Sequence, residues 1–588
     1  MISADEIRRG VRTFATWQEI HAAPGPSRLE DIERRIAEFS CMGLLEMACR
    51  YNAIIQDHHY RATAHIGLFR ALMSPELTVA FRQAIARGLT ADGVLHRQQL
   101  LTFMKLALVR GRLEGGRLIL ADADDRDLGD LLLMINDDLI PPLDERGEDE
   151  ERRQRVLAHM VLHNVLSHAT HVINAIGRNA RMLEVHEEFR VRGHREFFDL
   201  AAEFLRVTGV TIDTYLHHLF AILALADTGV PQLLAGNLRA IVIQPETALQ
   251  GTAVEVDEFR ATLRQLSLTP EQAHARLTDG RPFEPYFDFV LFQDYPLIEF
   301  PEGHFWPLDM GFILDKFAEG IFWLLHRPDP ALDEASLTRR NRRFRQWWGR
   351  LFEEYAHRLM EFFFPPIGRY SRIPDDPGEA MTRCDAVLET RPELVLFEYK
   401  ASYLRTDAKL SGSPGQLLED VRRKVATAAG GGEGAKGIHQ LAASCVRFHQ
   451  TGEIPGLGAI GGIRRVYPVL VTLDAAFAAN GMNRYLDELF KGAVGPLANP
   501  GVVAPLTVLT AEDLENVLPY TPERSFVDLL QTYHTEDPEL LTSFRFVAQR
   551  RIRRERWPEN GFTAPKALEW QQALIERYFP RRGDGAIT

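Results

Sequence analysis

The stretch from residue 382 to residue 401 is the feature that most restricts how this chain can fold. Residues 384–389 alternate polar and apolar side chains, and residues 390–393 carry the proline and charged side chains of a turn. Residues 394–399 are a nearly continuous apolar run with β-forming side chains. The pattern predicts a two-stranded hairpin whose second strand is buried on both faces, not a charged edge strand.

Two charged residues are set into the buried second strand at its end. Glu398 and Lys400 are two positions apart, so both side chains point to the same face of the strand. Asp385 lies near the start of the first strand, where a turn of this length brings it beside them. Burying two carboxylates and an ammonium is costly unless they bind something. Carboxylates this close together suit a hard divalent cation with oxygen ligands.

Asp385 followed by Glu398–Tyr399–Lys400 resembles the signature of the PD-(D/E)xK, or restriction-endonuclease-like, nucleases. The resemblance covers about a third of the chain. One position departs from the family pattern, since Cys384 stands where a proline often precedes the aspartate. That proline is loosely kept in such nucleases, so the departure weakens the resemblance little.

Two flanking segments strengthen the resemblance. Residues 349–355 resemble the family's first core helix, which often carries a further metal-binding glutamate. Glu353 is the first choice for that glutamate and Glu354 the second, because periodicity does not separate neighbours. Residues 436–441 resemble the helix after the catalytic hairpin, where Gln440 matches a glutamine that commonly faces the active site.

The resemblance implies functional residues for a metal-dependent phosphodiesterase. The implied catalytic residues are Asp385, Glu398, Lys400 and Gln440. The implied ligands of one or two Mg²⁺ ions, with Mn²⁺ as the alternative, are Glu353, Asp385, Glu398 and the backbone carbonyl of Tyr399. The metal would lower the pKa of bound water, and Lys400 would orient that water and stabilise the charged phosphorus centre.

A run of arginines lies just before the implied first core helix. The residues proposed to contact nucleic-acid phosphates are Arg339, Arg340, Arg342, Arg343 and Arg345. The alternative is a solvated helix face whose arginines pair with acidic neighbours. That alternative stays open because the net charge of the chain is −13, so no global basic field attracts nucleic acid.

The composition is that of a soluble globular protein. A chain of 588 residues is too long for one core and predicts several domains. Its four cysteines lack the spacing of a zinc site or a disulfide framework and favour a reducing compartment. There is no signal-peptide pattern and no apolar run long enough to span a membrane, so we expect a cytoplasmic protein without membrane contact.

The predicted fold is an α/β nuclease domain, with a mixed central sheet flanked by helices, preceded by a large mainly α-helical region. Beyond the hairpin, further strands are expected at residues 466–473 and 502–509. The predicted divisions are a helical region at 1–280, an aromatic β-hairpin plus helix at 281–330, the nuclease domain at 335–520 and a helical tail at 521–588. The aromatic residues of the second division are expected to fill a core.

The function that these features favour is Mg²⁺-dependent hydrolysis of phosphodiester bonds, with DNA favoured over RNA as the substrate. By analogy of architecture, the expected role is an effector of bacterial anti-phage defence or restriction. The helical region would sense a trigger, bind a protein partner or form a homo-oligomer. Two alternatives remain: an RNase effector, and a catalytically silent nucleic-acid-binding or assembly protein with a nuclease fold.

Overall fold

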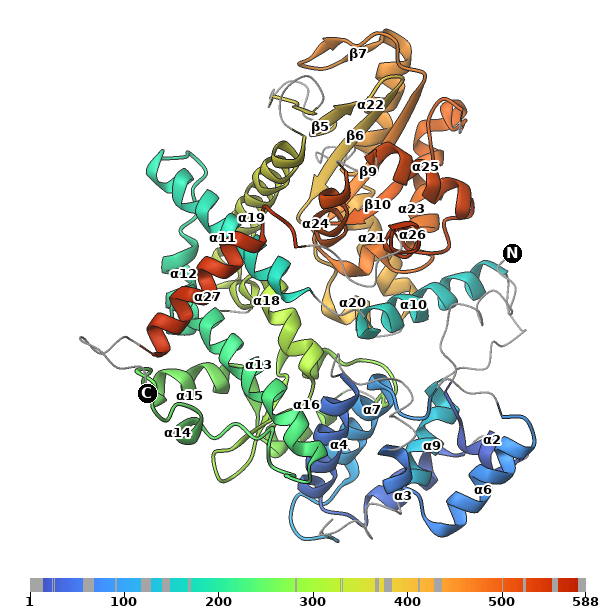
Figure 1. The fold of residues 1–588 in the computed structure, drawn as a ribbon, viewed down its shortest axis with the longest axis vertical. Helices are drawn as coiled ribbons and strands as arrows, with labels where there is room; N and C mark the ends of the chain where they lie inside the picture. The colour runs from blue at the N-terminus through green and yellow to red at the C-terminus, as the bar shows by residue number, and fades with distance from the viewer. Residues whose placement is uncertain are drawn as a thin grey trace. The chain divides into compact units, whose positions relative to one another are not determined.

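The structure is a computed structural model. It describes residues 14–23, 25, 27–56, 68–89, 93–117, 128–139, 149–167, 171–280, 283–327, 329, 331–364, 370–374, 383–410, 413–427, 436–499, 501–521, 525–552 and 559–579. These residues are mainly helical and include one five-stranded mixed sheet (Figure 1). The chain divides into two compact units, each made of several stretches. The first unit comprises Met1–Gly147, Val210–Lys316 and Arg577–Thr588, and the second comprises Glu148–Gly209 and Phe317–Glu576.

The first unit is built from helices around an apolar core. Its helices are α2 (Trp17–His21), α3 (Leu29–Ile36), α4 (Cys41–Gln56), α6 (Pro75–Ala86), α7 (Arg97–Arg110), α9 (Leu128–Leu139), α13 (Ile212–Leu234), α14 (Pro245–Ala248), α15 (Val256–Gln265), α16 (Pro270–Thr278) and α17 (Val290–Asp294). Helix α7 packs against α4, α9 and α16, and its side chains from Gln99 to Val109 are buried. A helix buried all round is the centre of its unit.

A small sheet completes the first unit. Its strands are β1 (Ser267–Leu268), β2 (Leu297–Glu299) and β3 (Phe305–Pro307), and helix α18 (Met310–His326) follows them. Strands β2 and β3 are antiparallel, which confirms the hairpin predicted from the aromatic pattern. Phe300, Phe305 and Trp306 are each no more than 3% exposed, so the prediction that these aromatic residues fill a core is also confirmed.

The second unit contains the five-stranded sheet, whose strand order is β10-β9-β6-β5-β4. The strands are β4 (Tyr370–Arg372), β5 (Ala386–Glu389), β6 (Glu393–Lys400), β9 (Arg465–Thr472) and β10 (Thr507–Thr510). Strands β4, β5 and β6 form an antiparallel meander, while β6, β9 and β10 are parallel. The carboxyl ends of the parallel strands therefore meet at one edge of the sheet, where β5 begins.

The other elements of the second unit are mainly helices. They are α10 (Asp149–Ser167), α11 (Val172–Val191), α12 (Leu200–Thr208), α19 (Glu334–Phe363), α20 (Thr406–Leu410), α21 (Pro414–Val425), α22 (Ile438–Thr451), α23 (Met482–Val494), α24 (Ala511–Val517), α25 (Phe526–Glu536), α26 (Phe544–Ile552) and α27 (Ala564–Tyr578). The short hairpin β7 (Glu453–Ile454) and β8 (Gly458–Ala459) precedes β9. Helix α19 begins at a cap in which Asp333 accepts a hydrogen bond from the backbone N–H of Ser336. Helix α19 packs on β4 and β6, and α22 packs on β6 and β9.

The predicted combination of a helical region and a mixed sheet is present, and the predicted strands at the hairpin and at residues 466–473 are confirmed. The last strand begins later than residue 502. Residues before it make only an isolated parallel bridge, between Val503 and Val466. The N–H of Leu506 is bonded to the Asp487 side chain of α23.

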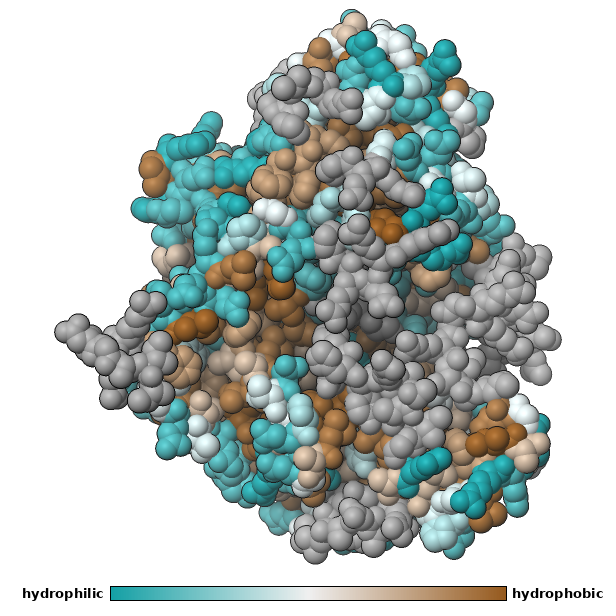
Figure 2. Space-filling model, viewed as in Figure 1, coloured by the Kyte–Doolittle hydropathy of each residue, from teal (hydrophilic) through white to brown (hydrophobic). Residues whose placement is uncertain are grey.

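The two compact units do not coincide with the predicted linear segments. Residues 148–209 fall inside the predicted helical region, yet they belong to the unit that contains the sheet. Arg358 of α19 binds Glu188 of α11 at 2.8 Å, and the indole N–H of Trp347 donates to His186 at 3.2 Å. Figure 2 shows mostly hydrophilic residues where Figure 1 places the outer ends of α11 and α12.

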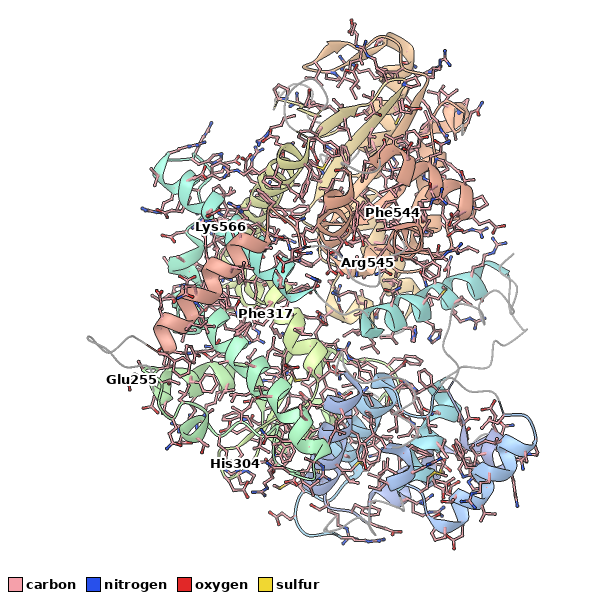
Figure 3. All side chains as sticks on the ribbon, viewed as in Figure 1. Glu255, His304, Phe317, Phe544, Arg545 and Lys566 are labelled. Carbon is pink, nitrogen blue, oxygen red and sulfur yellow. The ribbon has the colours of Figure 1, made fainter. Side chains whose placement is uncertain are left out.

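The C-terminal helices belong to the same unit as the sheet. Arg545 of α26 donates to Asp513 of α24 at 2.8 Å and lies 2.9 Å from a Glu512 oxygen. Lys566 of α27 lies 2.7 Å from Glu184 of α11; both cations are labelled in Figure 3. These ion pairs tie the segment after residue 521 to the sheet and to α11.

No single helix among the described residues has both the length and the apolar composition needed to cross a membrane. Only a bent pair, α12 together with α13, meets that criterion.

Candidate active site

The β5–β6 hairpin brings Asp385 against the end of β6. The backbone N–H of Asp385 donates to the carbonyl of Phe397 at 2.8 Å, and Ala386 pairs with Phe397 in the antiparallel ladder. The Asp385 carboxylate accepts a hydrogen bond of 2.6 Å from the backbone N–H of Tyr399. This side chain is therefore fixed between Glu398 and Lys400, as the sequence predicted.

Glu398 and Lys400 form an ion pair on one face of β6. The Glu398 side chain is completely buried, whereas 23% of the Lys400 side chain is exposed. Oxygen Oε2 of Glu398 has no hydrogen-bond partner among the described residues. A buried carboxylate oxygen without a donor is costly, because it has lost its water and gained no replacement.

The neighbouring glutamates of α19 have separate roles. Glu354 binds Arg358 at 2.8 Å and also pairs with Arg372 of β4. Glu353 lies 3.8 Å from a ring nitrogen of His357, and 28% of its side chain is exposed. Of the two, Glu353 is the one whose charge acts on Asp385, Glu398 and Lys400. The structure therefore places Glu353, the first choice, with the hairpin residues.

The pKa values show that these four side chains act on one another. Burial raises the pKa of Asp385 to about 6, with Lys400 opposing and Glu353 adding to the rise. Burial and the Asp385 carboxylate raise the pKa of Glu398 well above its usual range. Burial would lower the pKa of Lys400, but the carboxylates of Glu398, Asp385 and Glu353 raise it above the ordinary value. Lys400 is thus the cation beside two buried carboxylates, Asp385 and Glu398, whereas Glu353 also pairs with Arg350 at 3.5 Å.

A chain of aromatic side chains connects α19 to β6 beneath this cluster. His357 Nδ1 lies 2.6 Å from the Tyr370 hydroxyl, which lies 3.1 Å from the Tyr399 hydroxyl. The His357 ring also meets the Tyr399 ring edge to face, with centroids 5.3 Å apart. His357 therefore contacts both Glu353 and the residue between Glu398 and Lys400, which fixes the helix relative to the strand.

Gln440 lies in the first turn of α22, which packs next to the hairpin. The backbone N–H of Cys384 donates to Ser444 Oγ at 2.8 Å, and Ser444 donates to the Gln440 carbonyl at 2.9 Å. The side-chain oxygen of Gln440 accepts a hydrogen bond from the backbone N–H of Gly437 at 2.9 Å. This bond caps the helix, so Gln440 would have to release it to serve the reaction.

The predicted arginine run occupies the first half of α19 and its members differ in surroundings. Arg340 forms an ion pair with Glu203 of α12, as the solvated-face alternative expects. Arg343 donates to the carbonyl of Phe197 at 3.4 Å. Arg339, Arg342 and Arg345 are exposed, and no described carboxylate forms an ion pair with them. The run is therefore partly structural and partly free to contact an anion.

The acidic side chains of this site do not form a closed metal cage. Within the described ranges, no group of three or more His, Cys, Asp and Glu side chains is placed to hold a metal ion. Mg²⁺ keeps several waters and is commonly held by one or two carboxylates, so it does not need such a cage. The buried, unpartnered Oε2 of Glu398 beside the Asp385 carboxylate is the feature that fits a hard cation.

The sequence did not single out His357, Tyr370 or their link to Tyr399. The spacing of Glu353 and His357, four residues apart on one helix face, was the available signal. Comparison with known proteins adds nothing to the assignment, since no family model, curated protein or solved structure matches this chain.

Proposed function

We propose that this protein is a Mg²⁺-dependent nuclease that hydrolyses phosphodiester bonds, with DNA the favoured substrate and Mn²⁺ an alternative metal. One observation carries the proposal: Asp385, Glu398 and Lys400 lie together at the end of the β5–β6 hairpin, the charge of Glu353 acts on them, and Glu398 keeps a buried oxygen without a donor among the described residues. The arrangement is the one implied by the PD-(D/E)xK resemblance. A mixed sheet with α19 before the hairpin and α22 after it also supports it.

In this proposal each residue has a distinct task. Asp385, Glu398 and Glu353 would hold the cation together with the backbone carbonyl of Tyr399, and the cation would supply an activated water and neutralise phosphate charge. The N–H of Tyr399 fixes the Asp385 carboxylate, so its remaining lone pairs have a defined direction.

Lys400 is suited to the transition state. Its raised pKa keeps the ammonium charged at neutral pH, so it can stabilise negative charge that develops on the phosphoryl oxygens. Because its side chain is partly exposed, it can reach a phosphate while it still contacts Glu398. Gln440 would position the attacking water after releasing Gly437.

The test is cleavage by purified full-length protein in Mg²⁺, Mn²⁺ or EDTA. The substrates are supercoiled plasmid, linear duplex, single-stranded DNA and RNA, with Lys400→Ala as the inactive control. We expect metal-dependent cleavage of DNA that the control lacks. Cleavage of RNA alone would establish the RNase alternative, and binding without cleavage in any metal would establish the silent alternative.

The biological role is proposed by analogy only. A nuclease site in one compact unit, with a second, mainly helical unit in the same chain, suits an effector of bacterial anti-phage defence or restriction in the cytoplasm. The helical unit would then bind a trigger, a protein partner or a second copy of the chain. Loss of phage protection in cells carrying Lys400→Ala, at equal protein level, is the expected result.

A further inference from the structure

Helix α19 carries the proposed metal ligand Glu353 on one face and a buried tyrosine on another. Glu353 and Tyr355 are two residues apart, so their side chains leave the helix about 200° apart. On the face of Glu353, His357 contacts Tyr370 of strand β4. Helix α19 packs against strand β6 and also against α11 (Figure 1). The position of Glu353 therefore depends on contacts made on more than one face of this helix.

Tyr355 is joined to α24 and α11 through one buried carboxylate. Its hydroxyl donates a hydrogen bond of 2.7 Å to Oε1 of Glu515 in α24. The guanidinium of Arg178 in α11 lies 3.2 Å from the same oxygen. Tyr355 and Glu515 are completely buried, and Arg178 is 5% exposed. One carboxylate thus connects three helices, of which one carries the proposed metal ligand.

The charge of Arg178 supports this connection. Burial raises the pKa of Glu515 to about 7, while the Arg178 charge and the Tyr355 hydrogen bond oppose the rise. Oxygen Oε2 of Glu515 has no donor among the described residues, so Arg178 and Tyr355 are the described side chains bonded to this carboxylate. Removing one partner of a buried ion pair is costly, because the other charge is left without compensation. We therefore expect the packing of α19 to change when Arg178 is lost.

A second polar contact joins the same two outer helices without reaching α19. Asn174 of α11 donates a hydrogen bond of 3.0 Å to Asn516 of α24, and Thr563 donates to Asn174 at 2.9 Å. All three residues are no more than 2% exposed. No hydrogen bond among the described residues connects these side chains to α19. The two contacts are therefore alike in burial and differ in whether they include α19.

Metal binding is sensitive to small shifts of a ligand. A ligating side chain has to be held within about 0.5 Å of its productive position. Outer contacts that orient ligands commonly change metal affinity by about 10–100-fold. The contact of His357 with Tyr370 fixes α19 on the sheet side. The chain of contacts from Arg178 through Glu515 to Tyr355 fixes it on another side.

We propose that Arg178 is a positioning residue of the candidate active site, which fixes α19 and the Glu353 carboxylate through Glu515 and Tyr355. This inference rests on the proposed nuclease function and refines it. It makes α11, which lies in the predicted helical region, a working part of the site. Arg178 would touch neither the metal nor the substrate, so its loss should weaken metal binding and leave the chemical step intact at saturating metal.

The test compares metal affinity with stability in full-length variants. Arg178→Met removes the charge, Tyr355→Phe removes one hydroxyl, and Asn516→Ala breaks the control contact between α11 and α24. Calorimetric titration of Mn²⁺ measures affinity, and thermal unfolding in EDTA measures the melting temperature. Arg178→Met should lose about tenfold in affinity, and Tyr355→Phe should lose less. Asn516→Ala should lower the melting temperature, because it leaves a buried donor unpaired, yet bind Mn²⁺ as the wild type does.

Tyr355→Phe decides the matter if Arg178→Met does not fold. A folded Tyr355→Phe variant with wild-type Mn²⁺ affinity would overturn the inference, whatever its melting temperature. An equal loss of affinity in Asn516→Ala would also overturn it, because any loosening of α11 would then be sufficient. So would a lower kcat of Arg178→Met at saturating Mn²⁺. In these cases the wild type still binds Mn²⁺ and the cation site stands, whereas a wild type that binds no metal would contradict the proposed function itself.

Discussion

Asp309 in the helical unit and Glu398 in the sheet unit are both almost completely buried, yet their surroundings are opposite. Arg97 donates two hydrogen bonds to Asp309, at 2.8 and 2.6 Å. Asn52, Gln56 and the backbone N–H of Phe312 donate to it as well. Each Asp309 oxygen is satisfied, so this carboxylate joins α4, α7 and α18 into one core.

Glu398 accepts far fewer hydrogen bonds than Asp309 does. Lys400 is its ion-pair partner and also acts on Asp385, and its Oε2 has no donor among the described residues. If Glu398 only stabilised the fold, we would expect both of its oxygens to be hydrogen-bonded, as those of Asp309 are. The difference distinguishes a carboxylate whose hydrogen bonds are all made within the protein from one with an unsatisfied oxygen, as the proposed cation site requires.

The largest expected effect is on catalysis. Lys400→Ala should reduce the cleavage rate at least about 10²-fold, because it removes the cation that faces the developing phosphate charge. The melting temperature should stay close to that of the wild type. Initial rates in Mg²⁺ and a thermal melt measure both quantities. If Lys400→Ala cleaves at the rate of the wild type, Lys400 is not a catalytic residue.

The next effect is on stability and contrasts the two carboxylates directly. Asp309→Ala should lower the free energy of unfolding by about 3–5 kcal/mol, because it removes the carboxylate that pairs with the buried Arg97 guanidinium. Glu398→Gln should leave that free energy unchanged or raise it, since it relieves repulsion among carboxylates. Urea unfolding in EDTA measures both. Similar losses of unfolding free energy in the two variants would contradict the proposed difference between Asp309 and Glu398.

A smaller effect is expected at His357. His357→Gln should weaken metal binding about 10–100-fold, as outer contacts of metal sites commonly do, because Glu353 would lose its positioning contact. Cleavage should recover at high Mn²⁺ if His357 only positions the ligand. A loss that no metal concentration restores would instead place His357 in the chemistry.

The smallest expected effect is a pH dependence of stability in EDTA. The pKa of Asp385 rises from 3.8 in the unfolded chain to about 6 in the folded protein. The folded state then binds more protons in this interval, so stability is greatest below pH 3.8 for this group and falls as the pH rises to about 6. Asp385→Asn should remove that fall. The same slope in the variant and the wild type would show that other groups cause it.

The sequence predicted the part of the site that depends on local pattern. Alternation and the apolar run predicted the β5–β6 hairpin, and the spacing of Glu398 and Lys400 placed both on one face of β6. The choice between Glu353 and Glu354 needed the position of α19 against the sheet, because neighbours on a helix differ by about 100° in direction. That position depends on contacts between distant segments, such as His357 with Tyr370.

For the same reason, local sequence pattern could not predict to which compact unit each helix belongs. Helices α11 and α27 join the sheet unit through partners far away in the chain, as in the contact of Arg181 with the Phe562 carbonyl at 3.1 Å. Likewise, Arg340 pairs with Glu203 of α12, whereas Arg345 is exposed. Composition gives both arginines the same charge and no means to tell them apart.

The most direct test is a calorimetric titration of Mn²⁺ or Mg²⁺ into the full-length protein and two matched variants. Glu398→Gln removes the carboxylate with the unpartnered oxygen, and Glu354→Gln removes an equal charge that Arg358 and Arg372 already satisfy. We predict that the wild type and Glu354→Gln bind the metal alike and that Glu398→Gln loses at least about tenfold in affinity. Metal binding by Glu398→Gln equal to that of the wild type would contradict the assignment of this hairpin as a cation site.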